Sequence, residues 1–490
     1  MSLSTQYSTG TLTRRIAEIG SQSIVEIRLS GQDIGEIVAV YPQVSMSSCE
    51  VSSGRLTYGG RLVCTIVYAD ESGKLCRIQK GAEFSHYADD DILAPAHRAI
   101  CTLSCEKSQI KRDGSSYLLG VVVGAKTQIF AAAERNMLSS AEGAVCLMEN
   151  AKLYTAVTFS GESEVEDDFD CNAEDVLIPA ADVLVLDCNC RAGAVEISGE
   201  IYLSLLAVRS SQPVSLDRII PFKAEIACED ALLNHNAVCR AEIKDISVTA
   251  KVNEEKGKCD VGVVAQLAFA GQYFEEEETP LVRDAFSCTN NLQLTFAEET
   301  AYPCTGVKVF SERVNGLCAT KARLDYTCAF LAAAVPKAEF SRTVGGLEGS
   351  VTATLLYEQN GEIRSTEVNL PFSVTLGGVS EHCKDMTVAV CGLNLRLRAE
   401  GECEAEAVLK IAAADCEEQT IRYVTEAVEG EELGACDSAL SVYIPTAGDN
   451  LWDTAKRLLQ SPEEIEATNP ELTFPLTGKE RILIYRPKNS

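Results

Sequence analysis

Apolar and polar residues alternate along most of the chain before residue 430, and three stretches share one version of this pattern. Each begins at a glycine (Gly60, Gly199 or Gly349) and continues for eight residues of alternating character. A two-residue period places the apolar side chains on one face of a β-strand. The pattern therefore predicts three equivalent, half-buried strands.

The same three stretches are followed by matching turns and by matching phenylalanines. The predicted turns are residues 70–73, 209–212 and 358–361, and the last contains Asn-Gly, a strong hairpin signal. A second extended segment then ends at Phe84, Phe222 or Phe372, which lie 16, 15 and 15 residues beyond the end of the first strand. Matched anchors at two spacings indicate an internal repeat.

The repeat is long enough for each copy to be a domain. Gly60 and Gly199 are 139 residues apart, and Gly199 and Gly349 are 150 apart. We expect antiparallel β-sandwich or open-barrel repeat domains at residues 1–150, 151–300 and 301–432. Helical periodicity is nearly absent from this region, apart from a possible short helix at residues 131–137.

The chemistry changes in the last segment, residues 438–490. Residues 441–444 and 481–485 are typical of short strands, and apolar residues at 451, 455 and 458 form one helical face. Ser461, Pro462 and Glu464 predict the capped start of a second helix. The predicted order is therefore βααβ.

This segment resembles a LysM domain. The resemblance rests on Gly448-Asp449 followed by Leu451-Trp452, on Ala455, on Asn469-Pro470 and on the closing residues 482–484. Thr454 departs from the family pattern, which has an apolar residue there, and the usual proline before Gly448 is displaced to Pro445.

The resemblance implies a ligand groove between residues 448–451 and 469–472. The candidate groove residues are Gly448, Asp449, Asn450, Leu451, Trp452, Asn469, Pro470 and Leu472. Trp452 and Leu451 could equally be core residues of a small domain, because buried aromatics more often pack than bind ligand. Both interpretations stay open at this point.

The repeats resemble SPOCS domains, a β-rich family of sporulating Firmicutes. The resemblance rests on the glycine–strand–turn–phenylalanine pattern and on Asp167-Asp168-Phe169 followed by residues 176–183. Tandem SPOCS domains closed by a LysM domain form the architecture of SipL-like spore coat morphogenetic proteins. That resemblance implies coat assembly at the forespore surface from the mother-cell cytoplasm, with the LysM domain docking onto the coat-basement ATPase.

Composition excludes some partners. The net charge of −29 repels nucleic acid and anionic membrane surfaces. No apolar run reaches the length of a membrane span, and the first ten residues lack a signal-peptide pattern, so we expect a cytoplasmic protein. The 21 cysteines are expected to be reduced, buried thiols, with late oxidative cross-linking within an assembly as a second hypothesis.

The sequence contains no convincing catalytic or metal-binding pattern. The four histidines lack zinc-finger spacing, and we predict no metal and no cofactor. Ser104 and Lys107 match Ser-x-x-Lys but occur in a predicted strand without companion motifs. We therefore predict a non-enzymatic assembly adaptor. The alternatives are a peptidoglycan- or N-acetylglucosamine-binding protein and, less favoured, an unrecognised enzyme.

Overall fold

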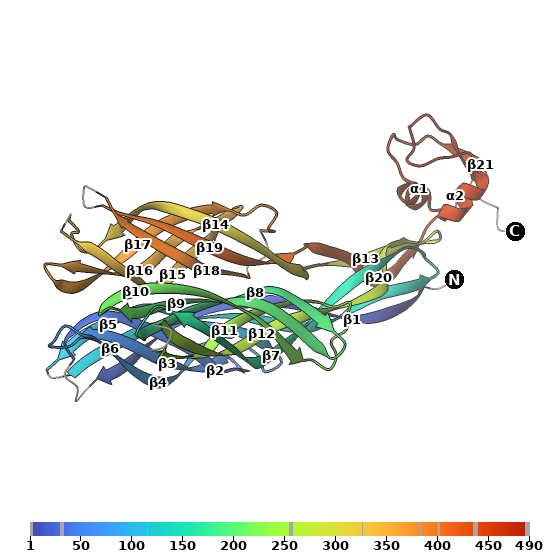
Figure 1. Cartoon of the computed structure of the whole chain (residues 1–490). Coiled ribbons are helices and arrows are strands. Elements are labelled where there is room, and N and C mark those ends of the chain that lie inside the picture. Colours follow the sequence, from blue (N-terminus) through green and yellow to red (C-terminus); the bar gives the residue numbers. More distant parts are fainter. Residues whose placement is uncertain are drawn as a thin grey trace.

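The computed structural model describes residues 3–29, 34–114, 116–253, 258–325, 327–381, 385–398, 402–434 and 440–485. Figure 1 shows three groups of long strands lying side by side, a narrower extension, and a small helical module at its end. Every strand pair in these ranges is antiparallel. The prediction of a mostly β, antiparallel fold is confirmed.

The first two groups each contain six strands. Barrel 1 consists of β1 (Ser4–Leu29), β2 (Glu36–Ser52), β3 (Arg55–Ala69), β4 (Leu75–Asp89), β5 (Arg98–Asp113) and β6 (Ser116–Glu142). Barrel 2 consists of β7 (Val145–Cys171), β8 (Asp175–Arg191), β9 (Ala194–Arg209), β10 (Gln212–Ala227), β11 (Asn236–Asn253) and β12 (Lys258–Phe286).

The third group is flanked by two further strands. Barrel 3 consists of β14 (Cys304–Thr320), β15 (Ala329–Thr343), β16 (Gly346–Gln359), β17 (Glu362–Thr375), β18 (Met386–Leu397) and β19 (Cys403–Cys416). The flanking strands β13 (Asn290–Ala301) and β20 (Gln419–Glu432) pair with each other.

The three barrels share one cyclic strand order. If the strands of each barrel are numbered one to six, the sheet of barrel 2 runs 4-3-2-5-6-1 and that of barrel 3 runs 2-3-4-1-6-5. Barrel 1 is divided into sheets 4-3-2 and 1-6-5. All these orders follow one ring, 1-4-3-2-5-6. They differ only in which neighbouring strands of the ring are not hydrogen-bonded to each other. Each group is therefore a nearly closed barrel of the same topology.

A glycine–phenylalanine pair explains the recurring sequence anchors. Gly60 lies directly opposite Phe84, Gly199 opposite Phe222, and Gly349 opposite Phe372 on strands three and four of each barrel. In the first two barrels, a Cβ on the glycine would lie under 3 Å from the phenylalanine ring. The ring occupies the space that the missing side chain leaves.

The three barrels meet in one apolar junction. It contains Val67, Leu206 and Leu356, which are the eighth residues of the three repeated strands, and each is almost fully buried. Strand two of every barrel adds further apolar residues. Equivalent positions thus converge, so the barrels surround a common axis.

The first and last strands of barrels 1 and 2 continue into a stalk, which the two strands that flank barrel 3 complete. Its three ribbons are the outer parts of β1 and β6, those of β7 and β12, and the pair β13 and β20. Equivalent residues form its core, namely Met137, Leu281 and Tyr423 in one layer and Leu138, Val282 and Val424 in the next. A one-residue bulge follows each second-layer residue, at Ser139, Arg283 and Thr425.

Three details of the sequence prediction need correction. The short helix expected at residues 131–137 is wrong, because these residues lie inside β6 and pair with β1 as one ribbon of the stalk. The expected domain limits at 150 and 300 fall inside β7 and β13. The chain turns instead at residues 143–144 and 287–289, because the long strands of the stalk continue past the barrels.

Candidate functional site

The C-terminal module is a two-stranded sheet with two helices. Its elements are β21 (Leu440–Tyr443), α1 (Leu451–Leu458), α2 (Pro462–Thr468) and β22 (Ile482–Tyr485). Ala455, Leu458, Ile465, Ile482 and Ile484 form its core. The predicted capping box at Ser461 and Glu464 is confirmed, since each side chain accepts a hydrogen bond from the other residue's backbone N–H.

The buried hydroxyl of Thr454 is satisfied within α1. Thr454 is fully buried, and its Oγ1 donates to the backbone carbonyl of Asn450 at 2.7 Å. A polar residue is therefore accommodated at a position where the LysM pattern has an apolar one, without an unpaired group in the core.

Asn469 holds the module together instead of facing a ligand. Only 1% of it is exposed. Its Nδ2 donates to the carbonyls of Ile465 and Leu483, both at 2.9 Å, and its Oδ1 accepts from the Leu483 N–H at 2.7 Å. The side chain therefore joins the end of α2 to β22.

The first predicted groove loop pairs with Leu476, which lies beyond the second loop. Gly448 N–H donates to the Leu476 carbonyl at 2.7 Å, and Leu476 N–H donates to the Asp449 carbonyl at 2.9 Å. Gly448 has φ of 93°, in the region that favours glycine. Leu451 and Leu472 are half-buried against the module core, whereas Pro470 is exposed.

Asp449 and Asn450 organise the start of α1. The Asp449 carboxylate accepts from Thr446 N–H and from Arg457, both at 2.9 Å. Both interactions lower the pKa of Asp449, and the Thr446 hydrogen bond has the larger effect. Asn450 is the N-cap of α1 and accepts from Asp453 N–H at 2.7 Å. Both polar side chains are therefore engaged within the module.

Trp452 contacts the tip of the stalk. Its Nε1 donates to Asp284 Oδ2 at 2.9 Å, and its ring meets the Phe286 ring edge-on at 5.3 Å. Lys456, one turn further along α1, places its Nζ 2.7 Å from both Asp284 carboxylate oxygens. Asp284 and Phe286 lie at the end of β12, directly after the bulge at Arg283. Trp452 thus fixes the module to the stalk.

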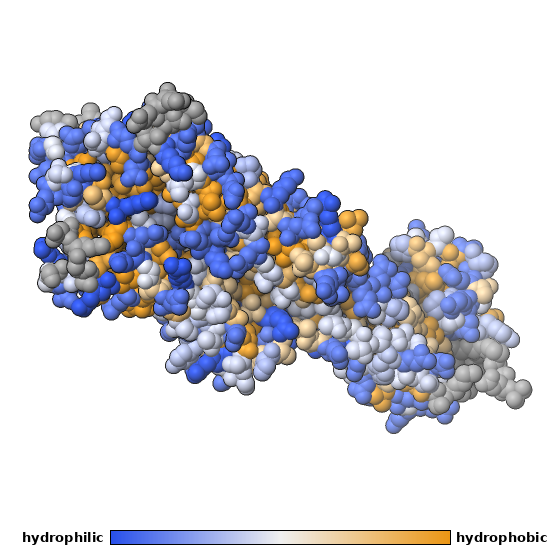
Figure 2. Space-filling view, turned by 60° about the horizontal axis from the view of Figure 1, so that its bottom comes forward, coloured by the Kyte–Doolittle hydropathy of each residue, from blue (hydrophilic) through white to orange (hydrophobic). Residues whose placement is uncertain are grey.

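An exposed apolar surface lies on the opposite side of the module's sheet. The outer sheet face consists of side chains that are 41–69% exposed, namely Leu440, Val442, Ile444, Leu483 and Tyr485. Leu440 lies opposite Tyr485 and Val442 opposite Leu483, so four of these five residues form two adjacent cross-strand pairs. Figure 2 shows apolar surface on the module at the right-hand end, and also over the barrels.

The sequence carried a signal for this face. In residues 482–485 every position is apolar or aromatic, and Ile482 and Ile484 alternate with Leu483 and Tyr485. Such a run is typical of a strand that is buried on both faces. This two-stranded sheet has helices on one side only, so its other apolar face is left uncovered.

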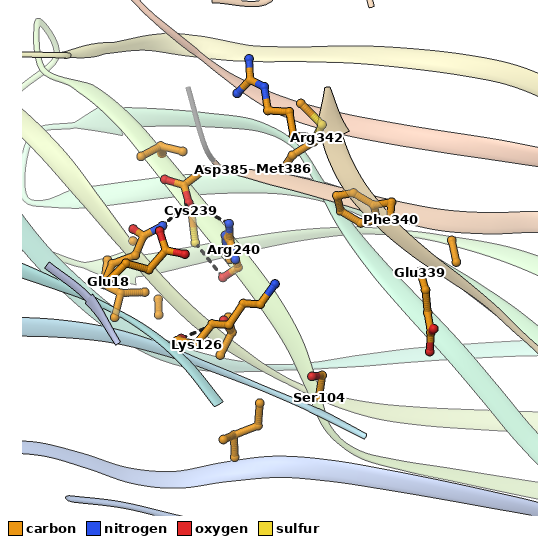
Figure 3. A pocket seen from close by; sticks show the side chains of 18 of the residues that line it. Glu18, Ser104, Lys126, Cys239, Arg240, Glu339, Phe340, Arg342, Asp385 and Met386 are labelled. Atoms are coloured by element: carbon orange, nitrogen blue, oxygen red, sulfur yellow. Dashed lines mark hydrogen bonds and ion pairs between the residues drawn. The ribbon is translucent and has the colours of Figure 1, made fainter. Parts of the chain in front are cut away.

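A second hollow lies where the three barrels converge. This cavity of about 1000 Å³ is lined by residues of all three barrels (Figure 3). Asp385 of barrel 3 accepts from Arg240 of barrel 2 at 2.7 Å and from Gln128 of barrel 1 at 2.9 Å. Ser104 also lines the cavity, whereas Lys107 is not among its lining residues. The polar network of the cavity thus joins the barrels.

Two half-buried carboxyl groups lie between barrels. Asp182 of β8 accepts from Val390 N–H of barrel 3, and burial raises its pKa to about 6 against that hydrogen bond and the Lys337 charge. Burial likewise raises the pKa of Glu242 to about 7, against the opposing Arg240 charge and a hydrogen bond from the Leu103 backbone. Both carboxyls therefore stay protonated up to a higher pH in the fold than in the unfolded chain.

The contribution of these two carboxyls to stability falls as the pH rises. Below about pH 3 they are protonated in the folded and the unfolded chain; above it the unfolded chain ionises first, and the loss is complete only above about pH 8. We expect Asp182→Asn to gain about 1–2 kcal/mol of unfolding free energy at pH 8 and far less at pH 4. Denaturant unfolding at the two pH values measures this, and an equal effect at both would contradict it.

Two of the four histidines have a structural role. His97 Nδ1 accepts from Ala94 N–H, and His235 Nδ1 accepts from Leu232 N–H, both at 3.2 Å, in equivalent turns of barrels 1 and 2. His382 lies outside the described residues. Within the described ranges, no three histidine, cysteine, aspartate or glutamate side chains are grouped to hold a metal ion.

No helix in the described part of the chain has the length and apolarity needed to cross a membrane. A scan against protein-family models found no match for this chain, and searches of curated proteins and of solved structures found none.

Proposed function

We propose that this chain is a non-enzymatic adaptor of spore coat assembly, in which the barrels and stalk are the scaffold and the module docks onto a protein partner. The observation that carries the proposal is the outer sheet face. Five large apolar side chains are exposed there, on a module at the far end of the stalk. Contiguous exposed apolar side chains of this kind mark sites of protein–protein interaction.

The engaged groove residues direct the proposal to this face. Asn469 and Asn450 are hydrogen-bonded within the module, and Trp452 contacts the stalk. A protein that used these residues would first have to break internal contacts. The outer sheet face can be covered without such a cost.

The spore coat assignment rests on the resemblance to SipL-like proteins with SPOCS and LysM domains. On that basis the partner is the coat-basement ATPase, and the site of action is the forespore surface in the mother-cell cytoplasm. The net charge of −29 favours a partner surface with basic residues around an apolar centre.

The test is capture of the purified coat-basement ATPase by the full chain. We expect Val442→Glu and Leu483→Glu each to weaken capture at least tenfold, because each places a charge in the apolar contact. Leu317→Glu is the matched control, since Leu317 is a similarly exposed strand residue of barrel 3. Its capture should equal that of the unmodified chain.

Equal capture by all three variants would refute the outer sheet face as the docking surface. Circular dichroism of each variant checks that the module remains folded. If the unmodified chain does not capture the ATPase at all, the partner assignment fails, and the spore coat role fails with it.

Glycan binding remains the second candidate function. The two loops that LysM domains use for N-acetylglucosamine leave Gly448 and Pro470 exposed, and Leu476 is hydrogen-bonded to the first of these loops. Co-sedimentation of the full chain with purified peptidoglycan tests this function. Absence of co-sedimentation would rule out the peptidoglycan-binding alternative.

A further inference from the structure

Six cysteines form three pairs across neighbouring strands. Cys171 lies directly opposite Cys259 in barrel 2, and in barrel 3 Cys304 lies opposite Cys416 and Cys318 opposite Cys403. None of the six forms a disulfide in the structure. Each pair joins strands one and six of its barrel.

The geometry of these pairs suits a disulfide. Directly opposite residues in an antiparallel ladder have Cα atoms about 4.5–5.5 Å apart, within the range that disulfides span. Opposite side chains also point to the same face of the sheet, and each pair belongs to a single apolar cluster. Bond formation therefore requires little movement of the backbone.

Each pair lies at the end of its ladder. Cys171 ends β7 and Cys259 is the second residue of β12. Cys304 and Cys416 terminate β14 and β19 at one end, and Cys403 begins β19 at the other. Strand ends open more readily than strand centres, which gives an oxidant access to buried sulfur atoms.

A hydrogen bond between the thiols of Cys318 and Cys403 brings the two sulfur atoms into direct contact. Burial raises the pKa of the Cys171 and Cys259 thiols. Because the thiolate is the attacking form, oxidation of the pair Cys171 and Cys259 should become faster as the pH rises.

We infer that these three pairs are oxidation sites, at which a small-molecule disulfide such as oxidised glutathione converts each dithiol into an internal cross-strand disulfide. One thiolate attacks the reagent and releases one glutathione, and the opposite thiol then displaces the second. Two cysteine thiols are oxidised, and one oxidised glutathione is reduced to two glutathione thiols, which carry the protons. Oxidation thus cross-links strand one to strand six within barrel 2 and within barrel 3.

The test uses the full chain, purified reduced and then treated with oxidised glutathione at pH 8. Mass spectrometry of non-reduced digests should find the three links Cys171–Cys259, Cys304–Cys416 and Cys318–Cys403. Each link closes a loop of roughly 100 residues, so the melting temperature should rise on the order of 10 °C. Dithiothreitol should reverse the rise.

Variants separate specific pairing from general oxidation. Cys403→Ser should lose only the Cys318–Cys403 link, whereas Cys146→Ser should keep all three, because Cys146 lies opposite Ala285. Six unreacted thiols, glutathione adducts without internal links, or links to other cysteines would each overturn the inference.

Discussion

Replacing Gly199 with alanine is expected to cost about 3 kcal/mol of unfolding free energy, one of the largest effects of any single methyl group in this protein. A Cβ at this position would lie 2.1 Å from the Leu184 carbonyl oxygen and 2.5 Å from the Phe222 ring. The backbone of β8 cannot retreat without breaking its ladder with β9. Denaturant unfolding followed by circular dichroism measures the loss.

Gly120→Ala is the matched control for this substitution. Gly120 also lies in a long strand, β6, but a Cβ there would meet no atom within 4 Å. Its stability should change by less than about 0.5 kcal/mol. If Gly199→Ala were as mild as Gly120→Ala, the close cross-strand pair of Gly199 and Phe222 would be refuted.

Leu206→Ala is expected to cost about 3–4 kcal/mol, because it opens a cavity where the three barrels meet. Leu206 is 1% exposed and packs in the junction with Val67 and Leu356. The loss should appear as a lower midpoint for the transition of the whole chain, since all barrels share this contact. Thermal and denaturant melts measure it.

Leu233→Ala provides the comparison for the junction. Leu233 is 81% exposed in the turn region between β10 and β11, so its truncation should leave the midpoint unchanged. Leu356→Ala should match Leu206→Ala, because the two leucines occupy equivalent places. A loss confined to one barrel's transition would contradict a shared junction.

In the candidate site, the sequence pattern predicted the local structure but not the contacts between distant segments. The start of α2 could be predicted because Ser461, Pro462 and Glu464 act within one turn of helix. The role of Trp452 could not, because its partner Asp284 is 168 residues away and reaches it only through the stalk. The sequence left open whether this tryptophan binds ligand or packs; the structure places it against the protein's own β12.

Local features of this protein could be predicted from its sequence alone. Alternation predicted the repeated strands and their buried face, and glycine and phenylalanine spacing marked the repeated hairpins, because these depend on neighbours along the chain or across one turn. Only the tertiary structure decided that residues 131–137 are strand, that Val67, Leu206 and Leu356 meet, and which module surface stays exposed. These outcomes depend on contacts between distant segments, whose burial outweighs the weak local preference of any one segment.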